Sequence, residues 1–367
     1  MLTAFLIGVG IVLVITTLLT LLVVIADSTI GDYGEVRIVI NDDKEVTVEG
    51  GKPLLASLKE HEIFIPSACG GRGSCGLCKC KVKRGAGPVL PTELPWLSKE
   101  ELEEGVRLSC QLKVKNDFEI EIPPELFNIK QFTTEVSHIR DLTHDIREVR
   151  LKLEDPDSIS FRAGQFIQFE VPEYELTEEP VYRAYSISSS PFETGMIELE
   201  IRYVPNGICT TYVHQHLKEG DRVIINGPYG DFFLRDTDAD IIFIAGGSGM
   251  APIKSILHTM KQNQNPRKTR YFFGARSKRD LFLVDEMRQL EEAIPDFKFI
   301  PALSEPQEED LWDGETGLIT EVVDKHVENG ENKEAYLCGS PGMIDACIKV
   351  LSKKGIPEEK IYYDKFG

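Results

Sequence analysis

The chain has 367 residues, of which 42% are apolar and 28% charged, a composition typical of a globular protein with two or three domains. Its formal net charge of −19 leaves no excess of Lys and Arg to neutralise phosphates, so we expect no nucleic-acid partner. Eight cysteines are too few for a disulfide scaffold of this length, which favours a reducing compartment.

The N-terminal segment carries the longest apolar run. Leu2 to Ile25 is a stretch of 24 residues without a charged side chain. A helix rising about 1.5 Å per residue would cross a hydrocarbon core of about 30 Å over this length. A cleaved signal peptide is the alternative, but no basic region precedes the run and no clear cleavage site follows it. We therefore predict a single-pass membrane anchor in residues 1–26.

Residues 33–125 alternate short strands with short helices and end at a Pro-Pro pair, so we predict a first folded domain there. Residues 36–40 and 45–48 alternate apolar and polar side chains like two strands of a hairpin. Further along we expect helices at 54–61 and 98–104, the second opened by a Ser98–Glu101 capping box, and strands at 80–83, 112–114 and 118–122.

Four cysteines in this domain have the spacing of metal ligands: Cys69-x5-Cys75-x2-Cys78-x31-Cys110. Three ligands in one loop and a distant fourth are the plan of plant-type [2Fe–2S] proteins. The loop also holds four glycines, which allow the left-handed backbone needed to wrap a cluster. The spacing therefore predicts a [2Fe–2S] centre.

Zinc is the alternative occupant of four cysteines. Structural zinc sites are typically built from two separated Cys-x2-Cys pairs, whereas only one such pair is present here. No histidine lies in the loop, which argues against a Rieske centre. Cys80 follows on a predicted strand, and we expect it to pack inside the domain rather than bind iron.

Residues 131–235 contain strands separated by turn residues, which predicts an antiparallel β-barrel with one helix near 211–217. Arg183, Tyr185 and Ser186 share one strand. An arginine fork suits a phosphate, a tyrosine ring suits stacking on an isoalloxazine, and a serine hydroxyl can reach the flavin N5 atom that accepts a hydride. The segment 207–211 precedes the helix, where anions bind. The Arg-Ala-Tyr-Ser motif is weak alone but predicts a flavin site in this context.

Residues 238–367 alternate strands and helices, which is typical of a doubly wound parallel sheet. The first strand, 241–245, leads into the glycine loop 246–249 and a helix, an arrangement that places a pyrophosphate on a helix N-terminus. Because the loop is not Gly-x-Gly-x-x-Gly, a tight turn without a ligand is the alternative for the glycines alone.

A second strand-end loop begins at Cys338. Ligands of doubly wound sheets bind at the carboxyl ends of the strands, so both loops should meet at one nucleotide site. The residues predicted to line it are Gly246, Gly247, Gly249, Pro252, Cys338 and Gly339.

Taken together, the motifs cover essentially the whole chain, and they resemble those of one known family. The chain resembles the ferredoxin–NADP reductase superfamily fused to a plant-type ferredoxin, and within it the F-subunit family of the sodium-translocating NADH:quinone oxidoreductases. The features that carry the resemblance are the anchor, the cysteine spacing, Leu90-Pro-Thr-Glu-Leu94, Arg-Ala-Tyr-Ser at 183–186, Gly-Pro-Tyr-Gly-Asp-Phe-Phe at 227–233, Gly-Ala-Arg-Ser-Lys-Arg at 274–279 and the ending Asp364-Lys-Phe366-Gly367.

The resemblance implies a multidomain fold: a transmembrane helix, an α+β β-grasp ferredoxin domain at 33–125, an antiparallel FAD-binding barrel at 131–235 and a doubly wound NAD-binding domain at 238–367. It implies that Phe366 lies against the second face of the flavin and that Cys338 lies near the nicotinamide, with Ser186 and Cys338 as catalytic residues. The residues that would bind FAD are Arg183, Tyr185, Ser186, Gly207, Thr210 and Phe366.

The activity implied is that of an NADH:quinone oxidoreductase component of the Na⁺-translocating type. Electrons would pass from NADH to FAD, to the [2Fe–2S] cluster and to a membrane acceptor, with quinone as the final acceptor and further membrane subunits as partners. Because NADH is cytosolic, the anchor would lie in the cell inner membrane and residues 27–367 would face the cytoplasm.

Three alternatives stay open. Family members carry a longer insertion ahead of residues 183–186, whereas only 172–182 intervene here, which favours a stand-alone membrane-anchored reductase serving an oxygenase or another acceptor. Arg276, Lys278 and Arg279 follow the second strand of the nucleotide domain, where they could favour NADPH over NADH. A non-catalytic redox sensor is the third alternative, and the complete set of cofactor motifs argues against it.

Overall fold

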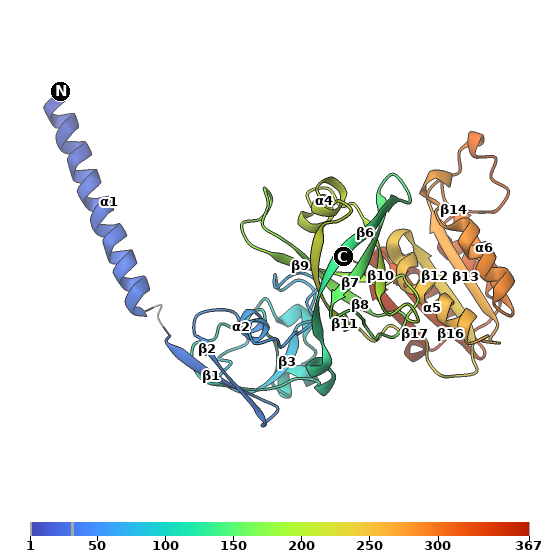
Figure 1. Ribbon diagram of the computed structural model, residues 1–367, viewed down its shortest axis with the longest axis horizontal. Helices are drawn as coiled ribbons and strands as arrows, with labels where there is room; N and C mark the ends of the chain where they lie inside the picture. The colour runs from blue at the N-terminus through green and yellow to red at the C-terminus, as the bar shows by residue number, and fades with distance from the viewer. Residues whose placement is uncertain (1, 31–32, 367) are drawn as a thin grey trace. The chain divides into compact units, whose positions relative to one another are not determined.

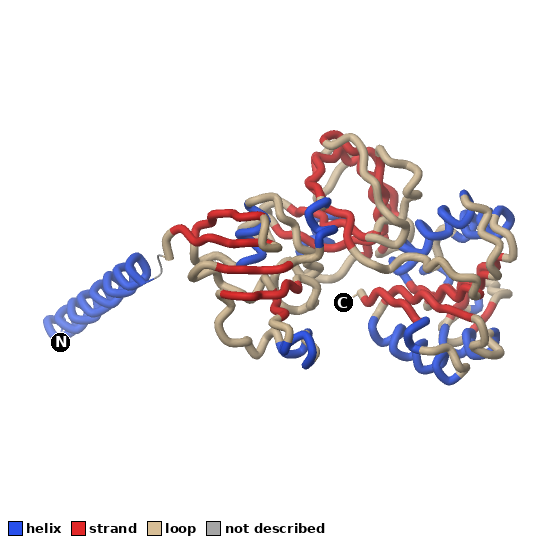
Figure 2. The backbone as a smooth tube through the Cα atoms, turned by 90° about the horizontal axis from the view of Figure 1, so that it is seen from below, coloured by secondary structure: helices blue, strands red, loops and turns tan. Residues whose placement is uncertain are grey.

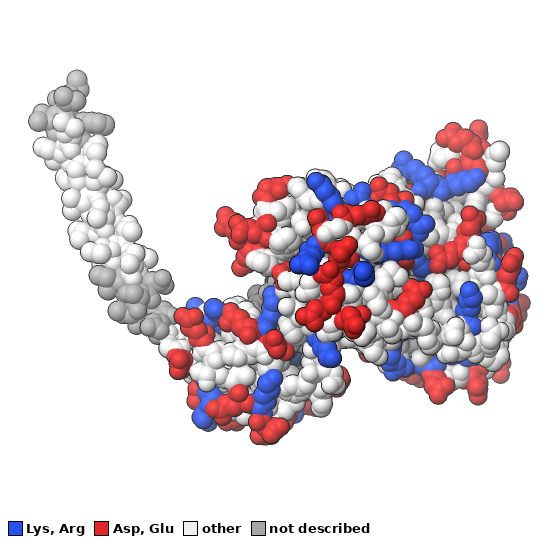
Figure 3. All heavy atoms as spheres, viewed as in Figure 1, with Lys and Arg blue, Asp and Glu red and all other residues white. Residues whose placement is uncertain are grey.

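The computed structural model describes residues 2–30 and 33–366 of the chain. Contacts divide the chain into two units, unit 1 (Met1–Asn128) and unit 2 (Ile129–Gly367). Unit 1 begins with helix α1 (Leu2–Ile30), which is long and apolar enough to cross a membrane over Leu6–Val24, with a mean hydropathy of 2.8. Figure 3 shows this stretch as a surface without charged side chains, whereas both signs of charge cover the visible face of each folded part.

The folded part of unit 1 is a five-stranded mixed sheet in the order β2-β1-β5-β3-β4 (Figure 1). Strands β1 and β5 pair in parallel and the other neighbours pair antiparallel. Leu54 and Leu58 of the short helix α2 are fully buried against the sheet, because they lie one turn apart on the same face of the helix. The elements are β1 (Glu35–Ile40), β2 (Lys44–Glu49), α2 (Leu54–Glu60), β3 (Lys79–Arg84), η1 (Leu94–Trp96), α3 (Lys99–Glu103), β4 (Val106–Leu108), β5 (Phe118–Glu121) and η2 (Pro124–Asn128).

Unit 2 begins with an antiparallel sheet in the order β10-β7-β6-β11-β8-β9. A bridge between Ile187 and Leu199 joins its two edges, so the sheet curls into a barrel. Alternate residues of each strand fill the barrel interior. The elements are β6 (Lys130–Asp141), β7 (Ile146–Asp155), β8 (Phe166–Val171), β9 (Val181–Ser186), β10 (Met196–Arg202), α4 (Ile208–Gln215) and β11 (Arg222–Tyr229).

The rest of unit 2 is a parallel sheet in the order β15-β14-β13-β12-β16-β17. Figure 2 shows helices on both faces of this sheet, and each face has its own apolar core. The elements are β12 (Asp240–Gly246), η3 (Gly247–Gly249), α5 (Met250–Gln262), β13 (Thr269–Ala275), η4 (Lys278–Asp280), α6 (Val284–Ala293), β14 (Phe297–Leu303), η5 (Glu308–Asp310), β15 (Glu315–Thr316), α7 (Ile319–His326), β16 (Lys333–Gly339), α8 (Pro341–Lys353), η6 (Glu358–Lys360) and β17 (Ile361–Lys365).

The barrel and the parallel sheet share one apolar core. Ile146, Ala163 and Phe232 of the barrel part pack with residues of β12, α5 and β16. Burial of apolar side chains on both sides stabilises this contact at about 25 cal/mol per Å² removed from water. Unit 2 therefore holds its two halves in a defined relation, which fixes strand β9 of the barrel relative to the loop after β12 of the parallel sheet.

Candidate functional site

The four cysteines with ligand spacing lie as two pairs in unit 1. Cys75 is the largest cause of the shift that lowers the pKa of Cys69 to about 4. Cys78 is likewise the largest cause for Cys110, whose pKa falls to about 7. The geometry thus joins the first two cysteines of the loop, and the third with the distant fourth.

Two pairs fit a binuclear cluster better than one zinc ion. Within residues 2–30 and 33–366, no three or more His, Cys, Asp or Glu side chains converge closely enough to hold a single metal ion. Tetrahedral zinc needs all four thiolates around one point, whereas each iron of a [2Fe–2S] cluster takes only two from the protein. Cys80, in contrast, is 3% exposed inside the unit 1 core, and burial raises its pKa to about 12.

The loop around the cysteines is held by its neighbours. The φ of Gly76 is +69°, and a Cβ at this position would lie 2.9 Å from Cε3 of Trp96, so the indole covers the loop closely. The side-chain amide of Gln111 donates to Sγ of Cys110 at 3.4 Å, and the hydroxyl of Thr92 donates to Gln111 at 2.9 Å. The segment around residues 92–96 therefore lies against the cysteine loop.

A buried ion pair, which sequence reasoning missed, supports that segment. Arg107 of β4 donates to the carboxylate of Glu93 and to the carbonyl oxygens of Gly87 and Pro88, each at 3.0 Å. Glu93 is fully buried and also accepts from the backbone N–H of Leu108 at 3.0 Å. Breaking such a pair leaves a buried charge uncompensated, typically at a cost of about 3–5 kcal/mol.

The three residues of the flavin motif lie on β9 of the barrel, at its edge. The hydroxyl of Tyr185 is buried without a hydrogen-bond partner in the described chain, and burial raises its pKa well above the usual value. Its ring contacts Phe169 edge-on, with ring centroids 6.1 Å apart. Ser186 is buried at the end of the strand, and the Arg183 guanidinium donates to the Tyr182 carbonyl at 2.7 Å. An orphaned tyrosine hydroxyl beside an arginine fits a polar, phosphorylated ligand such as a flavin nucleotide.

Gly207 is the N-cap of α4 and Thr210 lies in its first turn, because the helix begins at Ile208 and not near residue 211 as the sequence predicted. The hydroxyl of Thr210 donates to the carbonyl of Val204 at 3.1 Å and accepts from the N–H of the same residue at 3.1 Å. A Cβ on Gly207 would lie 2.6 Å from Oγ1 of Thr210, so a side chain there would disturb this turn. In this structure the hydroxyl closes the turn at the start of the helix, and a helix N-terminus is a position that suits an anion.

The two strand-end loops predicted for the nucleotide meet at the carboxyl edge of the parallel sheet. A Cβ on Gly249 would lie 2.3 Å from the carbonyl oxygen of Cys338, and one on Gly339 would lie 3.4 Å from the carbonyl oxygen of Gly246. Gly247 has a φ of +58° and turns the chain into α5, where Pro252 is buried in the first turn. Only glycine permits this approach of the two backbones.

The C-terminal residues return to the same edge. The N–H of Phe366 donates to the carbonyl of Gly339 at 2.9 Å, and β17 pairs Asp364 with Cys338. The Cys338 side chain is fully buried, and burial raises its pKa well above the usual value, so it is a neutral thiol. The motifs at 246–249 and 338–339 and the residue Phe366 thus lie together although they are far apart in sequence.

Two further residues lie at this edge to which the sequence analysis assigned no role, Arg202 and Asp364. A Cβ on Gly247 would lie 3.4 Å from Nη1 of Arg202, so the guanidinium borders the glycine loop, and Arg202 also donates to Asp145 at 2.7 Å. Burial raises the pKa of Asp364, opposite Cys338, to about 6. Arg202 ends a barrel strand and Asp364 lies in a strand that the pattern did not reveal, so only the packed structure indicates their place.

Fold and site together define a class of protein: an oxidoreductase that uses NAD, FAD and a [2Fe–2S] cluster. Three known domain families match in the same order along the chain. The 2Fe-2S iron–sulfur cluster binding domain matches residues 38–115, the oxidoreductase FAD-binding domain residues 133–234, and the oxidoreductase NAD-binding domain residues 243–349.

Relatives that match over almost the whole chain define the family within this class of oxidoreductases. The F subunit of the Na(+)-translocating NADH-quinone reductase of Neisseria gonorrhoeae is 41% identical, with 98% of each chain covered, and that of Actinobacillus succinogenes is 40% identical, with 99% of each covered. The chain belongs to this family of F subunits. The alignment with the Neisseria protein is 400 positions long against 367 residues here, so at least 33 positions have no counterpart in this chain.

Solved structures of reductases share the architecture. The cytochrome P450 reductase GcoB of Amycolatopsis is 28% identical with a TM-score of 0.73, covering 90% of this chain and 98% of its own. A ferredoxin reductase in carbazole 1,9a-dioxygenase is 29% identical with a TM-score of 0.70, covering 91% of this chain and 98% of its own.

Proposed function

We propose that the chain is the electron-input component of a Na⁺-translocating NADH:quinone reductase, passing electrons from NADH through FAD and its [2Fe–2S] cluster to a membrane acceptor. The observation that carries this function is the 41% identity to such an F subunit along 98% of both chains. It is supported by a nucleotide edge, a flavin strand and two cysteine pairs in the same chain.

In this proposal the carboxyl edge of the parallel sheet binds NADH. The N-terminus of α5 and the glycines 246, 247 and 249 receive the pyrophosphate, and the guanidinium of Arg202 lies close enough to the loop to pair with it. Pro252, Cys338 and Gly339 shape the pocket for the nicotinamide, and the neutral thiol of Cys338 packs there without adding a charge.

The barrel strand β9 and the N-terminus of α4 hold FAD. FAD accepts a hydride from NADH and gives up its electrons singly, which a nicotinamide cannot do. Arg183 and the first turn of α4, with Gly207 and Thr210, hold its phosphates, Tyr185 offers its ring and its free hydroxyl, and Phe366 covers the opposite face. We propose that Ser186 assists as a hydrogen-bond donor at the atom that receives the hydride.

The distinction between NADH and NADPH rests on the turn after β13. Arg276 pairs with Glu305 at 3.1 Å, and the ammonium of Lys278 donates to the carbonyl of Asp310 at 2.8 Å. Arg276 and Lys278 are thus engaged by groups of the same chain, which supports NADH because a 2′-phosphate would have to displace these contacts. The side chain of Arg279, the third cation of the turn, is 76% exposed and lies 3.9 Å from Asp280.

The site of action that we propose is the cell inner membrane. Helix α1 is the single-pass anchor, and residues 27–367 face the cytoplasm, where NADH is found. Further membrane subunits take the electrons from the cluster, and quinone is the final acceptor. The proposed domain limits are 1–26, 33–125, 131–235 and 238–367.

A stand-alone reductase for an oxygenase is the second candidate. The similarity to two oxygenase-system reductases over about 90% of the chain, together with the missing positions relative to the Neisseria protein, favours it. Co-purification decides between the two. An electron-input component will purify together with the membrane subunits expressed beside it, and the complex will show Na⁺-stimulated quinone reduction. A stand-alone reductase will purify alone and will show no Na⁺-stimulated quinone reduction.

Replacing one cluster ligand tests the order of the electron path. We expect Cys75→Ala to lose the visible absorption and the paramagnetic resonance signal of the cluster, while NADH still reduces the flavin in stopped flow, because all nucleotide and flavin motifs lie in unit 2. Turnover with the native membrane acceptor should collapse, whereas reduction of an artificial dye should persist. Cys80→Ala, at a buried cysteine outside the two pairs, is the matched control. Native turnover without a cluster would contradict the path.

A further inference from the structure

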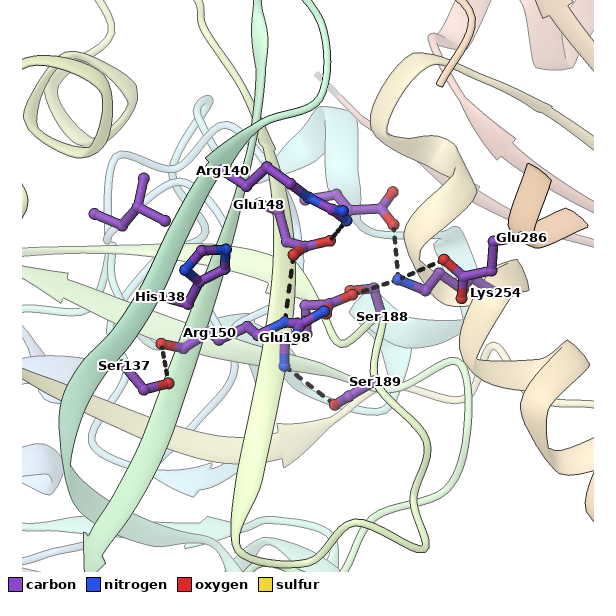
Figure 4. A network of polar contacts seen from close by, with 12 residues as sticks. Ser137, His138, Arg140, Glu148, Arg150, Ser188, Ser189, Glu198, Lys254 and Glu286 are labelled. Atoms are coloured by element: carbon purple, nitrogen blue, oxygen red, sulfur yellow. Dashed lines mark hydrogen bonds and ion pairs between the residues drawn. The ribbon is translucent and has the colours of Figure 1, made fainter. Parts of the chain in front are cut away.

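A buried ion cluster joins the barrel to the helices of the parallel sheet (Figure 4). At its centre Lys254 of α5 is only 3% exposed. Its ammonium pairs with Glu198 of β10 and lies 3.8 Å from the carboxylates of Glu200 and Glu286. Lysine is almost never buried so deeply unless it is paired, so this position has a specific role. We refer to these four residues as the Lys254 cluster.

Two of the three acidic partners belong to the barrel strand β10, whose side chains alternate between its two faces, and the third, Glu286, lies on α6. Ile197, Leu199 and Ile201 of β10 fill the barrel interior, while Glu198 and Glu200 point to the other face. That face would be open to water on an isolated barrel. Here both carboxylates are buried because they lie against α5, so the Lys254 cluster exists only while the two halves of unit 2 are docked.

Three carboxyl groups surround the single ammonium at the centre of the cluster. Glu198 is satisfied by Lys254, by Arg150 at 2.8 Å and by the hydroxyl of Ser188 at 3.0 Å. Neither oxygen of Glu200 has a hydrogen-bond partner in the described chain. Burial lowers the pKa of Lys254, but the carboxylates of Glu200 and Glu198 outweigh it and raise that pKa to about 12. The ammonium is therefore charged at neutral pH, and removing it would take from the buried Glu198 carboxylate one of its two cationic partners.

The cluster connects the two cofactor sites through short stretches of backbone. Lys254 lies in the second turn of α5, the helix that begins at the glycine loop 247–249. The next residue, Ser255, donates its hydroxyl to the carbonyl of Ser189 at 2.7 Å. Ser188 and Ser189 follow closely on Ser186 at the end of the flavin strand β9. The ion pair and this hydrogen bond thus tie the end of the flavin strand to the start of the nucleotide helix.

We propose that Lys254 is a positioning residue for the hydride step, because its pairing with Glu198 sets where the nucleotide loop lies relative to the flavin strand. The proposal rests on the proposed function, since it concerns the geometry between the bound NADH and FAD. Hydride transfer needs reacting atoms held about 3–3.5 Å apart, and a misplacement of about 1 Å can cost about a hundredfold in rate. The expected effect is therefore on the rate of flavin reduction more than on cofactor content.

The experiment uses the full chain in detergent, with FAD and cluster contents measured by absorbance and paramagnetic resonance. We expect Lys254→Met to lower the single-turnover rate of flavin reduction by NADH at least tenfold and to weaken the long-wavelength charge-transfer band of the NADH–flavin complex. The affinity for NADH should change less than threefold, and flavin reduction by dithionite should be unchanged. Lys261→Met, at an exposed lysine of the same helix, is the matched control and should behave as the wild type.

A double-mutant cycle separates positioning from a general loss of stability. Lys254→Met and Glu198→Gln remove the two sides of one pair, so the double variant should be little slower than the slower single variant. Ser255→Ala removes only the hydrogen bond to the carbonyl of Ser189, so it should slow flavin reduction by a smaller factor while the cofactors are retained. A wild-type rate in Lys254→Met, or single-variant effects that multiply in the double variant, would overturn the proposal. A wild-type chain that NADH does not reduce would instead contradict the proposed function itself.

Discussion

Burial decides the protonation of several side chains near the nucleotide edge. Cys338 and Tyr271 are fully buried, and burial raises the pKa of both groups well above their usual values. Glu200 lies close to both, and burial, reinforced by the neighbouring carboxylates, raises its pKa to about 8 although Lys254 acts in the opposite direction. A carboxylic acid that is protonated at neutral pH is unusual, and it makes the stability of unit 2 depend on pH.

The pH dependence has a definite sign. The pKa of Glu200 is about 8 in the folded chain against 4.5 as the ordinary value, so the folded state binds more protons between these limits. Its contribution to stability is full below about pH 4.5 and is lost as the pH rises through 8. We expect the unfolding free energy of Glu200→Gln to rise relative to that of the wild type as the pH rises from about 4.5 to about 8. Above pH 8 the difference between the two should level off. Urea unfolding, followed by flavin fluorescence at pH 6 to about 9, measures this difference in unfolding free energy. A difference that does not depend on pH would contradict the raised pKa of Glu200.

At the scale of elements, the cysteine loop shows how a neighbouring segment shapes a ligand site. Gly76 has a left-handed φ of +69° and lies under Trp96 of η1, and Glu93, just before η1, is held by Arg107 of β4. The loop conformation therefore depends on a second segment of the same unit, which is itself fixed by a buried ion pair.

Two glycines with the same backbone test this dependence. Gly76→Ala and Gly87→Ala both place a Cβ on a left-handed residue, at a cost of about 1 kcal/mol each, with φ values of +69° and +64°. Only at Gly76 would the Cβ also meet Trp96, at 2.9 Å, whereas nothing lies within 4 Å at Gly87. We expect Gly76→Ala to purify with clearly less cluster, measured by iron content and visible absorption, and Gly87→Ala to keep it. Equal loss in both would show that backbone strain alone matters.

At the scale of the whole molecule, helix α1 differs from the folded units in composition and in burial, which agrees with the anchor that we propose. Helix α1 carries no charged side chain over Leu6–Val24, none of this stretch is buried, and it contributes no residue to the apolar cores. The cofactor motifs all lie after it. An apolar helix without protein contacts is stable in lipid and not in water, which agrees with a tether rather than a structural support.

Removal of the tether tests this proposal. A chain that lacks residues 1–26 should be soluble without detergent and should retain FAD, the cluster signal and NADH-dependent reduction of an artificial dye at rates within about twofold of the full chain. Quinone reduction in membranes should fall to background, because the shortened chain no longer stays beside its acceptor. A truncated protein without FAD or cluster would show that α1 supports the fold.

The sequence by itself determined the features that depend on local patterns. The apolar run indicated α1, the alternation at 36–40 and 45–48 indicated the β1–β2 hairpin, and the predicted Ser98–Glu101 capping box is present at α3. Cysteine and glycine spacing indicated the cluster loop and the loop after β12, because only a few residue types can adopt those conformations. The strand predicted at 112–114 was wrong: Lys113 makes only an isolated bridge to Pro53.

Tertiary structure alone decided the features that depend on what covers a side chain. Strand β17 was not recognised, because its five residues mix charged and aromatic side chains and become a strand only by pairing with β16. Lys254, Glu198 and Glu200 look in sequence like solvent-facing charges of a helix and an edge strand, and they are buried only because the two halves of unit 2 dock on each other. Arg202 and Asp364 reach the nucleotide edge for the same reason, since the packing of distant segments, and not the local pattern, brings them there.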